Sequence, residues 1–167
     1  MESIFFFVVA AVAVLSSILV VTCKNPINSA LSLVMTFFCL ATFYVMLDAP
    51  FMAVTQVIVY AGAIMVLIIF VIMLLNVKAE TGKRGSHAVL SGTVIGIFVL
   101  FQTCWFLMKG SMTGLGGTMD KAQIVKVGHV EMIGKALFTD FLLPFEITSL
   151  LLLAAIIGAV ILAKKKI

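Results

Sequence analysis

The sequence predicts an all-α, polytopic membrane protein with five transmembrane helices. Hydrophobic residues make up 63% of the 167 residues and charged residues only 11%, and the mean hydropathy is +1.30. An ordinary soluble domain carries about 25% charged residues. The composition therefore excludes a soluble globular enzyme, a disordered chain and a disulfide-framed secreted module. The basic residues are scattered between apolar segments, so we expect no nucleic-acid partner.

Five apolar segments are long enough to cross a lipid bilayer. A helix rises about 1.5 Å per residue, so roughly 20 residues span a hydrocarbon core of about 30 Å. The alternation typical of membrane barrel strands is absent. We expect one membrane domain over residues 1–167, with a long outer-side loop at 109–140 in which residues 133–138 favour a short interfacial helix. The expected membrane helices are residues 3–23, 28–47, 53–76, 88–108 and 141–163.

The distribution of basic residues predicts the orientation. Loops on the cytoplasmic side of a membrane protein are enriched in Lys and Arg. Five spans place the two termini on opposite sides, and the side with more basic residues contains the C-terminus. We therefore expect the N-terminus outside and the C-terminus inside. The basic residues on the inner side are Lys24, Lys78, Lys83, Arg84, Lys164, Lys165 and Lys166, and those on the outer side are Lys109, Lys121, Lys126 and Lys135.

The sequence offers little chemistry of its own. Cys23, Cys39 and Cys104 are far apart and form no C-x-x-C pair, which argues against a structural zinc or iron–sulfur site. We expect no metal ligand, no cofactor-binding residue and no catalytic residue in this chain. A short chain with no soluble part is more typical of a subunit in a larger membrane assembly.

The third apolar segment contains the unusual polar and small residues. Gln56 and Tyr60 are four residues apart and share a helix face. The cluster of Ala61, Gly62 and Ala63 removes side-chain bulk near the middle of the span. Such a cluster is either a plain packing notch or a point where the backbone changes conformation.

Glu146 is the one carboxylate inside an expected span. It follows Pro144, so we expect it in the first turn of the last helix, where the helix dipole favours an anion. The alternative is a carboxylate on a proton path. Two small-residue pairs, Gly92 with Gly96 and Ala154 with Gly158, are interpreted as packing faces without a further role.

The third segment also resembles a known family. Residues 58–67 read IVYAGAIMVL and residues 73–76 read MLLN, which is similar to the signature of NADH-quinone oxidoreductase subunit J, a membrane subunit of respiratory complex I. Three further segments agree with the resemblance, in order along the chain. They are NP at 25–26, GKALF at 134–138, and LPFE at 143–146 with SLLLL at 149–153.

The resemblance implies a place in a larger enzyme. Complex I passes electrons from NADH through FMN and iron–sulfur clusters to a quinone and couples this to proton translocation. A J-type subunit binds none of these groups. It lies among K-type, H-type, A-type and antiporter-like subunits in the lipid bilayer. The resemblance also implies a multi-pass protein of the bacterial plasma (inner) membrane.

The resemblance further implies a moving part. The third helix of the family is thought to alternate between a regular helix and one with a π-bulge, which opens or closes a water path. The matching positions here are Tyr60, Gly62, Val66 and Phe70. Some members of the family have Glu where this chain has Gln56. Because a Gln side chain carries no ionisable group, this position cannot ionise here. A gate would then depend on apolar occlusion by Val66 and Phe70.

Two alternatives remain beside the gating subunit. The chain could serve only as a structural scaffold of the same complex, or it could belong to a related multi-subunit cation/proton antiporter. The motif of the third segment favours the complex over the antiporter. It does not separate gating from packing.

Overall fold

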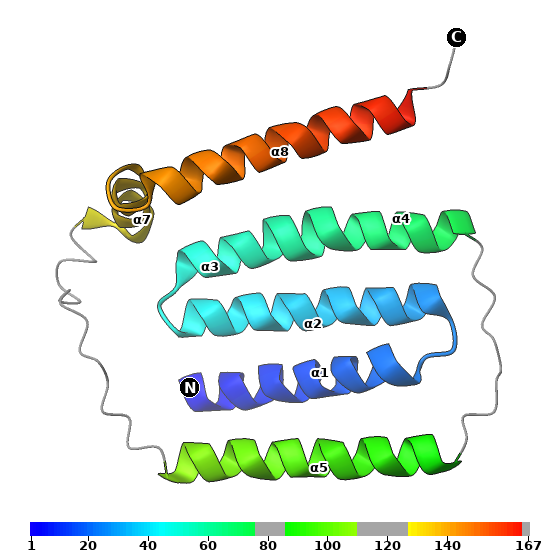
Figure 1. Cartoon of the computed structure of the whole chain (residues 1–167). Helices are drawn as coiled ribbons and strands as arrows, with labels where there is room; N and C mark the ends of the chain where they lie inside the picture. Colours follow the sequence, from blue (N-terminus) through cyan, green and yellow to red (C-terminus); the bar gives the residue numbers. More distant parts are fainter. Residues whose placement is uncertain (76–85, 110–126, 165–167) are drawn as a thin grey trace.

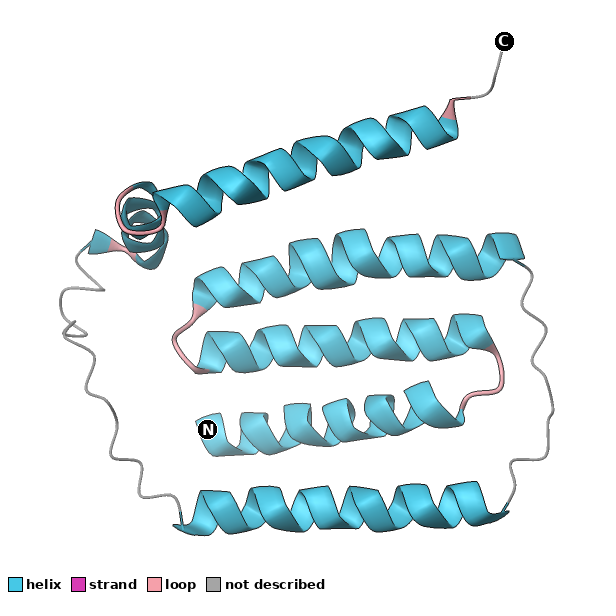
Figure 2. Cartoon of the chain, in the orientation of Figure 1, coloured by secondary structure: helices cyan, strands magenta, loops and turns pink. Residues whose placement is uncertain are grey.

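The structure is a computed structural model, which describes residues 1–75, 86–109 and 127–164. Every element in these ranges is helical (Figure 2), and five helices are long and apolar enough to cross a membrane. This confirms the all-α class and the five spans, whereas the orientation of the termini stays a prediction. The elements are α1 (Glu2–Thr22), α2 (Pro26–Met46), α3 (Pro50–Thr55), η1 (Gln56–Ile64), α4 (Met65–Leu75), α5 (Ser86–Lys109), α7 (His129–Phe138) and α8 (Leu142–Ala163).

Two prolines begin helices that we expected to start later. Pro26 and Pro50 are the first residues of α2 and α3, where the sequence predicted starts at 28 and 53. Proline is favoured at the first position of a helix, because its φ fits and its missing N–H would have no partner there anyway. Asn25 caps α2, since its side-chain oxygen accepts a hydrogen bond of 2.9 Å from the Ile27 N–H.

The connection expected at 109–140 contains a helix, α7, that is longer than the 133–138 predicted. It follows Gly128, whose φ of 92° favours glycine. The Phe138 and Phe145 rings, with centroids 5.1 Å apart, join α7 to the start of α8. Several basic residues that were counted in predicting the orientation lie outside the described residues: Lys78, Lys83, Arg84, Lys121, Lys126, Lys165 and Lys166.

The helix α2 is the centre of the packed part of the chain. Figure 1 shows α2 between α1 on one side and the continuous helix of α3, η1 and α4 on the other. Lipid is as apolar as leucine, so membrane helices associate through close packing of small residues. The buried side chains fit this rule, because most are small. They are Ser16, Ala30, Cys39, Ala41, Ala53, Gln56, Ala61 and Met65.

Specific contacts support the packing around α2. The Phe6 and Phe43 rings lie 5.5 Å apart between α1 and α2, and the Ser29 hydroxyl on α2 donates a hydrogen bond to the Val20 carbonyl on α1. A hydroxyl that crosses between helices satisfies itself without water, which the bilayer core does not supply. The first two spans are thus fixed to each other by polar as well as apolar contacts.

A tight turn joins α2 to α3. The Ala49 N–H donates to the Tyr44 carbonyl at 2.9 Å, and the Asp48 N–H donates to the Val45 carbonyl at 3.1 Å. This is the pattern of a Schellman motif, which needs a left-handed residue after the helix. Asp48 supplies it, with φ of 56°, and Asp tolerates this region better than most residues. The turn holds the end of α2 against the start of the third span.

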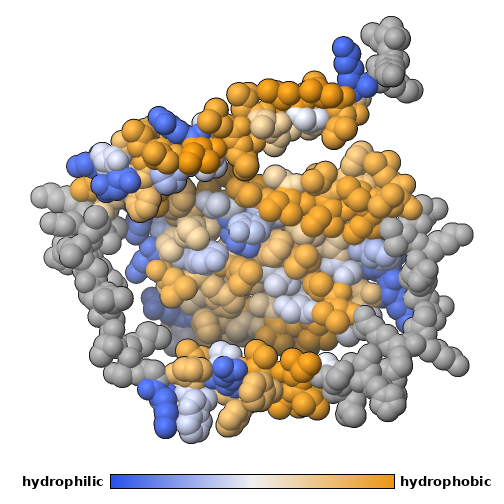
Figure 3. All heavy atoms as spheres, in the orientation of Figure 1, coloured by the Kyte–Doolittle hydropathy of each residue, from blue (hydrophilic) through white to orange (hydrophobic). Residues whose placement is uncertain are grey.

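The helices α5 and α8 stand apart from the packed group. Among the described elements, α5 contacts none, and α8 contacts only α7. Nearly all described side chains of α8 are exposed, and Figure 3 shows hydrophobic surface along most of its length. In a membrane, such surfaces face lipid or other proteins.

The packing around α2 predicts that added bulk destabilises the chain. Ala41→Leu places three more carbons at a side chain that is 6% exposed. We expect a loss of about 1–3 kcal/mol, the usual cost of overpacking, measured as a lower unfolding temperature of the purified chain in detergent by circular dichroism. Ala155→Leu, at an exposed position of α8, is the matched control. Equal unfolding temperatures for the two variants would contradict α2 as the packing centre.

Candidate functional site in the third membrane span

The third span contains a π-helical segment. It is η1, Gln56–Ile64, with regular α-helix on both sides. In a π-helix each carbonyl accepts a hydrogen bond from the amide five residues later. Such segments are rare in proteins overall, but many of those known lie at functional sites. β-branched residues precede Gly62, and both residue types have a lower preference for a regular α-helix than alanine. The segment overlaps the motif at residues 58–67 that carried the resemblance.

Gln56 is the first residue of η1 and faces into the packed group. Its side chain is 7% exposed, and none of the described residues forms a hydrogen bond with its amide. No fully enclosed side-chain nitrogen or oxygen lacks a partner within the described part of the chain. The amide therefore still reaches the surface, where a water molecule or a neighbouring protein can bond to it. An amide without any partner in a dry setting would cost several kcal/mol.

Tyr60 connects η1 to α2. Its ring lies 6.0 Å from the Phe37 ring at an interplanar angle of 64°, an edge-to-face contact that aromatic pairs prefer. The side chain remains 45% exposed. Tyr60 thus contacts α2 through its ring, whereas Gln56 is buried and Tyr60 is not.

Gly62 occupies a crowded point of η1. A Cβ atom built there would lie 3.3 Å from the carbonyl oxygen of Val57, five residues earlier. This oxygen belongs to the backbone, so it moves only if the helix itself changes. A side chain at Gly62 would therefore require the backbone of η1 to shift by a few tenths of an ångström.

Val66 and Phe70 lie beyond the π-helical segment. Both are in α4, with side chains 63% and 51% exposed. The structure does not bring them against Gln56 or Tyr60 within this chain. Their exposed surface is apolar, so we expect any barrier that they form to involve a neighbouring molecule.

Sequence reasoning missed the residues that hold the third span against α2. Ala53, Ala61 and Met65 are buried, and Met65 is only 1% exposed. Ala61 and Met65 were inside the quoted motif, but their spacing of four residues alone did not distinguish them from Val66 and Phe70. The signal is the small size of Ala53 and Ala61, which permits close approach of two helices.

Glu146 is not in the first turn of the last helix. α8 begins at Leu142, so Pro144 is its third residue and Glu146 its fifth. The Phe145 N–H already donates to the Phe141 carbonyl at 3.0 Å. Proline is tolerated throughout the first turn, so Pro144 does not mark the first residue of α8, whose start differs by one residue from the predicted 141. The carboxylate is exposed, and no described residue pairs with it.

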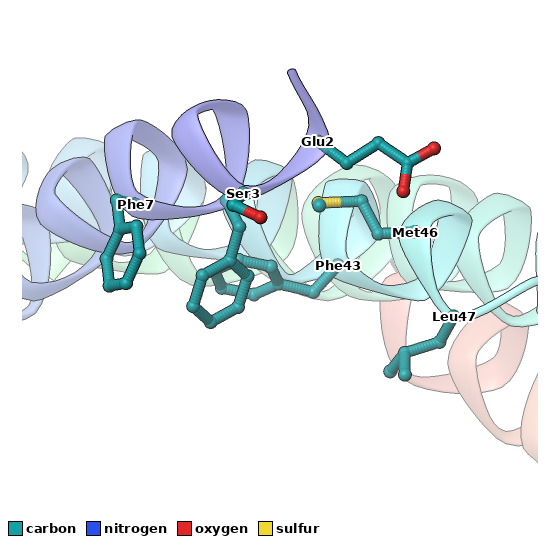
Figure 4. A pocket seen from close by; sticks show the side chains of 7 residues that line it. Glu2, Ser3, Phe7, Phe43, Met46 and Leu47 are labelled. Atoms are coloured by element: carbon teal, nitrogen blue, oxygen red, sulfur yellow. The ribbon is translucent and has the colours of Figure 1, made fainter.

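A hollow near the N-terminus has a mostly apolar lining. It has a volume of about 580 Å³ between the start of α1 and the end of α2. Figure 4 shows the Glu2 carboxylate pointing away from the rings of Phe7 and Phe43. The described residues contain no group of three His, Cys, Asp or Glu side chains that could hold a metal. The hollow supplies apolar surface rather than a set of ligands.

Two curated relatives resemble the chain over most of its length. The NAD(P)H-quinone oxidoreductase subunit 6 of Staurastrum punctulatum is 41% identical over 144 residues, covering 84% of this chain and 78% of the relative. The subunit of the same name in Physcomitrium patens is 33% identical over 172 residues, covering 99% of this chain and 86% of the relative. Both relatives are named as chloroplastic, so the bacterial plasma membrane stays a prediction.

A family described as NADH-ubiquinone/plastoquinone oxidoreductase chain 6 matches residues 16–162, a range that includes η1 and nearly all of α8. This confirms the resemblance to a membrane subunit of complex I that the motif in the third span indicated. The chain belongs to the NADH-ubiquinone/plastoquinone oxidoreductase chain 6 family.

Proposed function

We propose that this chain couples quinone reduction to proton transfer in an NAD(P)H-quinone oxidoreductase complex, through a change of η1 between π-helical and α-helical forms. The observation that carries the proposal is the nine-residue π-helical segment inside a membrane span. A rare backbone form persists only where its surroundings maintain it, and such forms cluster at sites that switch. The names of the two relatives supply the reaction.

The geometry of helices gives the size of the movement. A π-helical turn contains about one residue more than an α-helical turn. Converting it to an α-helix therefore rotates the helix beyond it by about 100° and shifts that helix by about 1.5 Å along its axis. If η1 becomes α-helical, Ile64 takes the place that Met65 now occupies against α2. Met65 then moves to the position of Val66, which is exposed in the present form.

The same rotation carries Val66 and Phe70 around the axis of α4. Their apolar side chains form a dry surface in one form and leave it in the other. Gln56 has no charge to exchange, so its amide holds water or a hydrogen-bond partner at the start of η1. The gate then works by wetting and drying a path between subunits.

The remaining partners of the reaction belong to other subunits. We propose NADH or NADPH as the donor, with FMN and iron–sulfur clusters in the complex, and a quinone as the acceptor. K-type, H-type, A-type and antiporter-like subunits are the proposed neighbours. The family membership supports a complex with several subunits, and this chain contributes no catalytic residue to the reaction.

Gly62→Val tests the movement of η1. The added side chain meets the Val57 carbonyl, and overpacking typically costs about 1–3 kcal/mol. A bias of about 1.4 kcal/mol changes the ratio of two forms by about tenfold. We expect both quinone reduction and proton pumping to fall several-fold in the assembled, purified complex.

Ala63→Val, at the next and exposed position, is the control and should keep both activities. Normal quinone reduction and pumping in an assembled Gly62→Val complex would discard the gate and leave the chain a scaffold.

Val66→Ser tests the dry barrier. A hydroxyl lets water enter an apolar constriction, so we expect fewer protons pumped per quinone reduced while the rate of quinone reduction stays near normal. Proteoliposomes with a pH-sensitive dye measure this ratio. Leu67→Ser, at a side chain 62% exposed, should leave the ratio unchanged, and an unchanged ratio in Val66→Ser as well would remove Val66 from the gate.

The proposed orientation places Lys109 outside and Lys164 inside. A cysteine introduced at either position, in a chain whose native cysteines are replaced, reports the side by reaction with a membrane-impermeant maleimide. We expect Lys109→Cys to react in sealed right-side-out vesicles and Lys164→Cys only after the membrane is opened. The reverse pattern would place the N-terminus inside.

A further inference from the structure

We propose that α8 docks onto a membrane helix of a neighbouring subunit, through a face that contains Glu146 and pairs this carboxylate with a Lys or Arg side chain of that subunit. The proposal concerns a surface apart from η1. It needs the chain to be part of an assembly with several subunits, which its family membership provides.

Glu146 is a charged residue in an apolar helix, and its carboxylate has no partner in the described part of the chain. It is the fifth of the 22 residues of α8, about 6 Å along the axis from Leu142. Its side chain is exposed, and no described residue forms an ion pair or hydrogen bond with the carboxylate. The nearby Ser149 hydroxyl donates to the backbone carbonyl of Glu146 at 2.7 Å and is therefore directed to its own helix.

Exposure to lipid is energetically unfavourable for the Glu146 carboxylate. A carboxylate in hydrocarbon costs several kcal/mol unless it is neutralised or paired, and ionisable residues in membrane spans almost always face protein or water rather than lipid. α8 covers about 33 Å, slightly more than a hydrocarbon core. Glu146 therefore lies near one edge of the apolar layer, where a basic side chain of a neighbouring subunit would stabilise its charge.

The same side of α8 is shaped for another helix. Glu146, Leu150, Leu153 and Ile157 follow the spacing of one helical stripe, and Leu150 and Leu153 are 65% and 55% exposed. Ala154 and Gly158 lie next to this stripe, and a Cβ at Gly158 would meet nothing within 4 Å. Two small residues that are four positions apart permit close approach of two membrane helices.

The rest of this chain leaves that face open. α8 contacts only α7 among the described elements, and α7 meets the start of α8 through Phe138 and Phe145. A basic side chain from a second helix would neutralise the carboxylate, and the small residues would let that helix lie close. Charge and shape thus point to one kind of occupant.

Glu146→Gln in the purified complex tests the charge. The amide keeps the size of the side chain but leaves the partner's basic group unpaired, and losing one member of a buried charge pair acts mainly on dissociation. We expect this chain to leave the complex in mild detergent at least about tenfold faster, equivalent to about 1.4 kcal/mol. Glu146→Asp keeps the charge and should dissociate at close to the original rate.

An unchanged dissociation rate in Glu146→Gln would overturn the docking. Unchanged dissociation together with reduced proton pumping would overturn it as well, because the carboxylate would then lie on a proton path. A failure of the η1 proposal leaves these outcomes unaffected, since dissociation is measured without turnover.

Photo-crosslinking identifies the occupant. A photoreactive residue replaces Leu153 on the proposed face or Leu152 on the other side of α8. We expect the probe at 153 to label one peptide of a neighbouring membrane span that contains a Lys or Arg, and the probe at 152 to label it far less. Labelling of lipid alone, or of a lysine segment of this same chain, would overturn the proposal.

The small residues give an independent measurement. Ala154→Leu should speed dissociation by preventing close approach, whereas Ala159→Leu adds the same atoms on the far side of the helix and should not. Equal rates for these two variants would show that the Ala154 side is not an interface.

Discussion

The structure depends on one constraint, the inability of hydrocarbon to form hydrogen bonds. Every backbone amide and carbonyl within the bilayer must find its partner in the protein, and helices achieve this within a single segment. The π-helix and the α-helix both do so, with partners five or four residues away. The third span can therefore differ in pitch along its length, as η1 does between α3 and α4, without exposing peptide groups to lipid.

The same constraint explains what the polar side chains do. Hydroxyls within the spans bond to carbonyls of the preceding turn, as Thr42 does to Phe38 at 2.9 Å and Thr55 to Phe51 at 2.9 Å. Gln56 and Glu146 have no such local solution in the described part of the chain. At these two positions a hydrogen-bond or charge partner has to come from water or from a neighbouring protein.

Composition predicted the fold class well, because the number of apolar segments and the length of each follow directly from the thickness of the bilayer. The starts of α2 and α3 were placed late, since proline fits at the first position of a helix as well as before it. The motif located the unusual part of the third span. Periodicity could not predict that Met65 is enclosed while Val66 is exposed, because a π-helical segment changes the face on which every later residue lies.

The left-handed turn at Asp48 has a consequence for any change in η1. It holds α3 directly to the end of α2 through the hydrogen bonds from Asp48 and Ala49. The upstream end of the third span is thus fixed to α2, so a change in the winding of η1 would move mainly the downstream helix, α4. A change of η1 in the middle of the membrane would rotate α4 up to Leu75 about its axis. The rotation would be felt by any protein that contacts the end of α4.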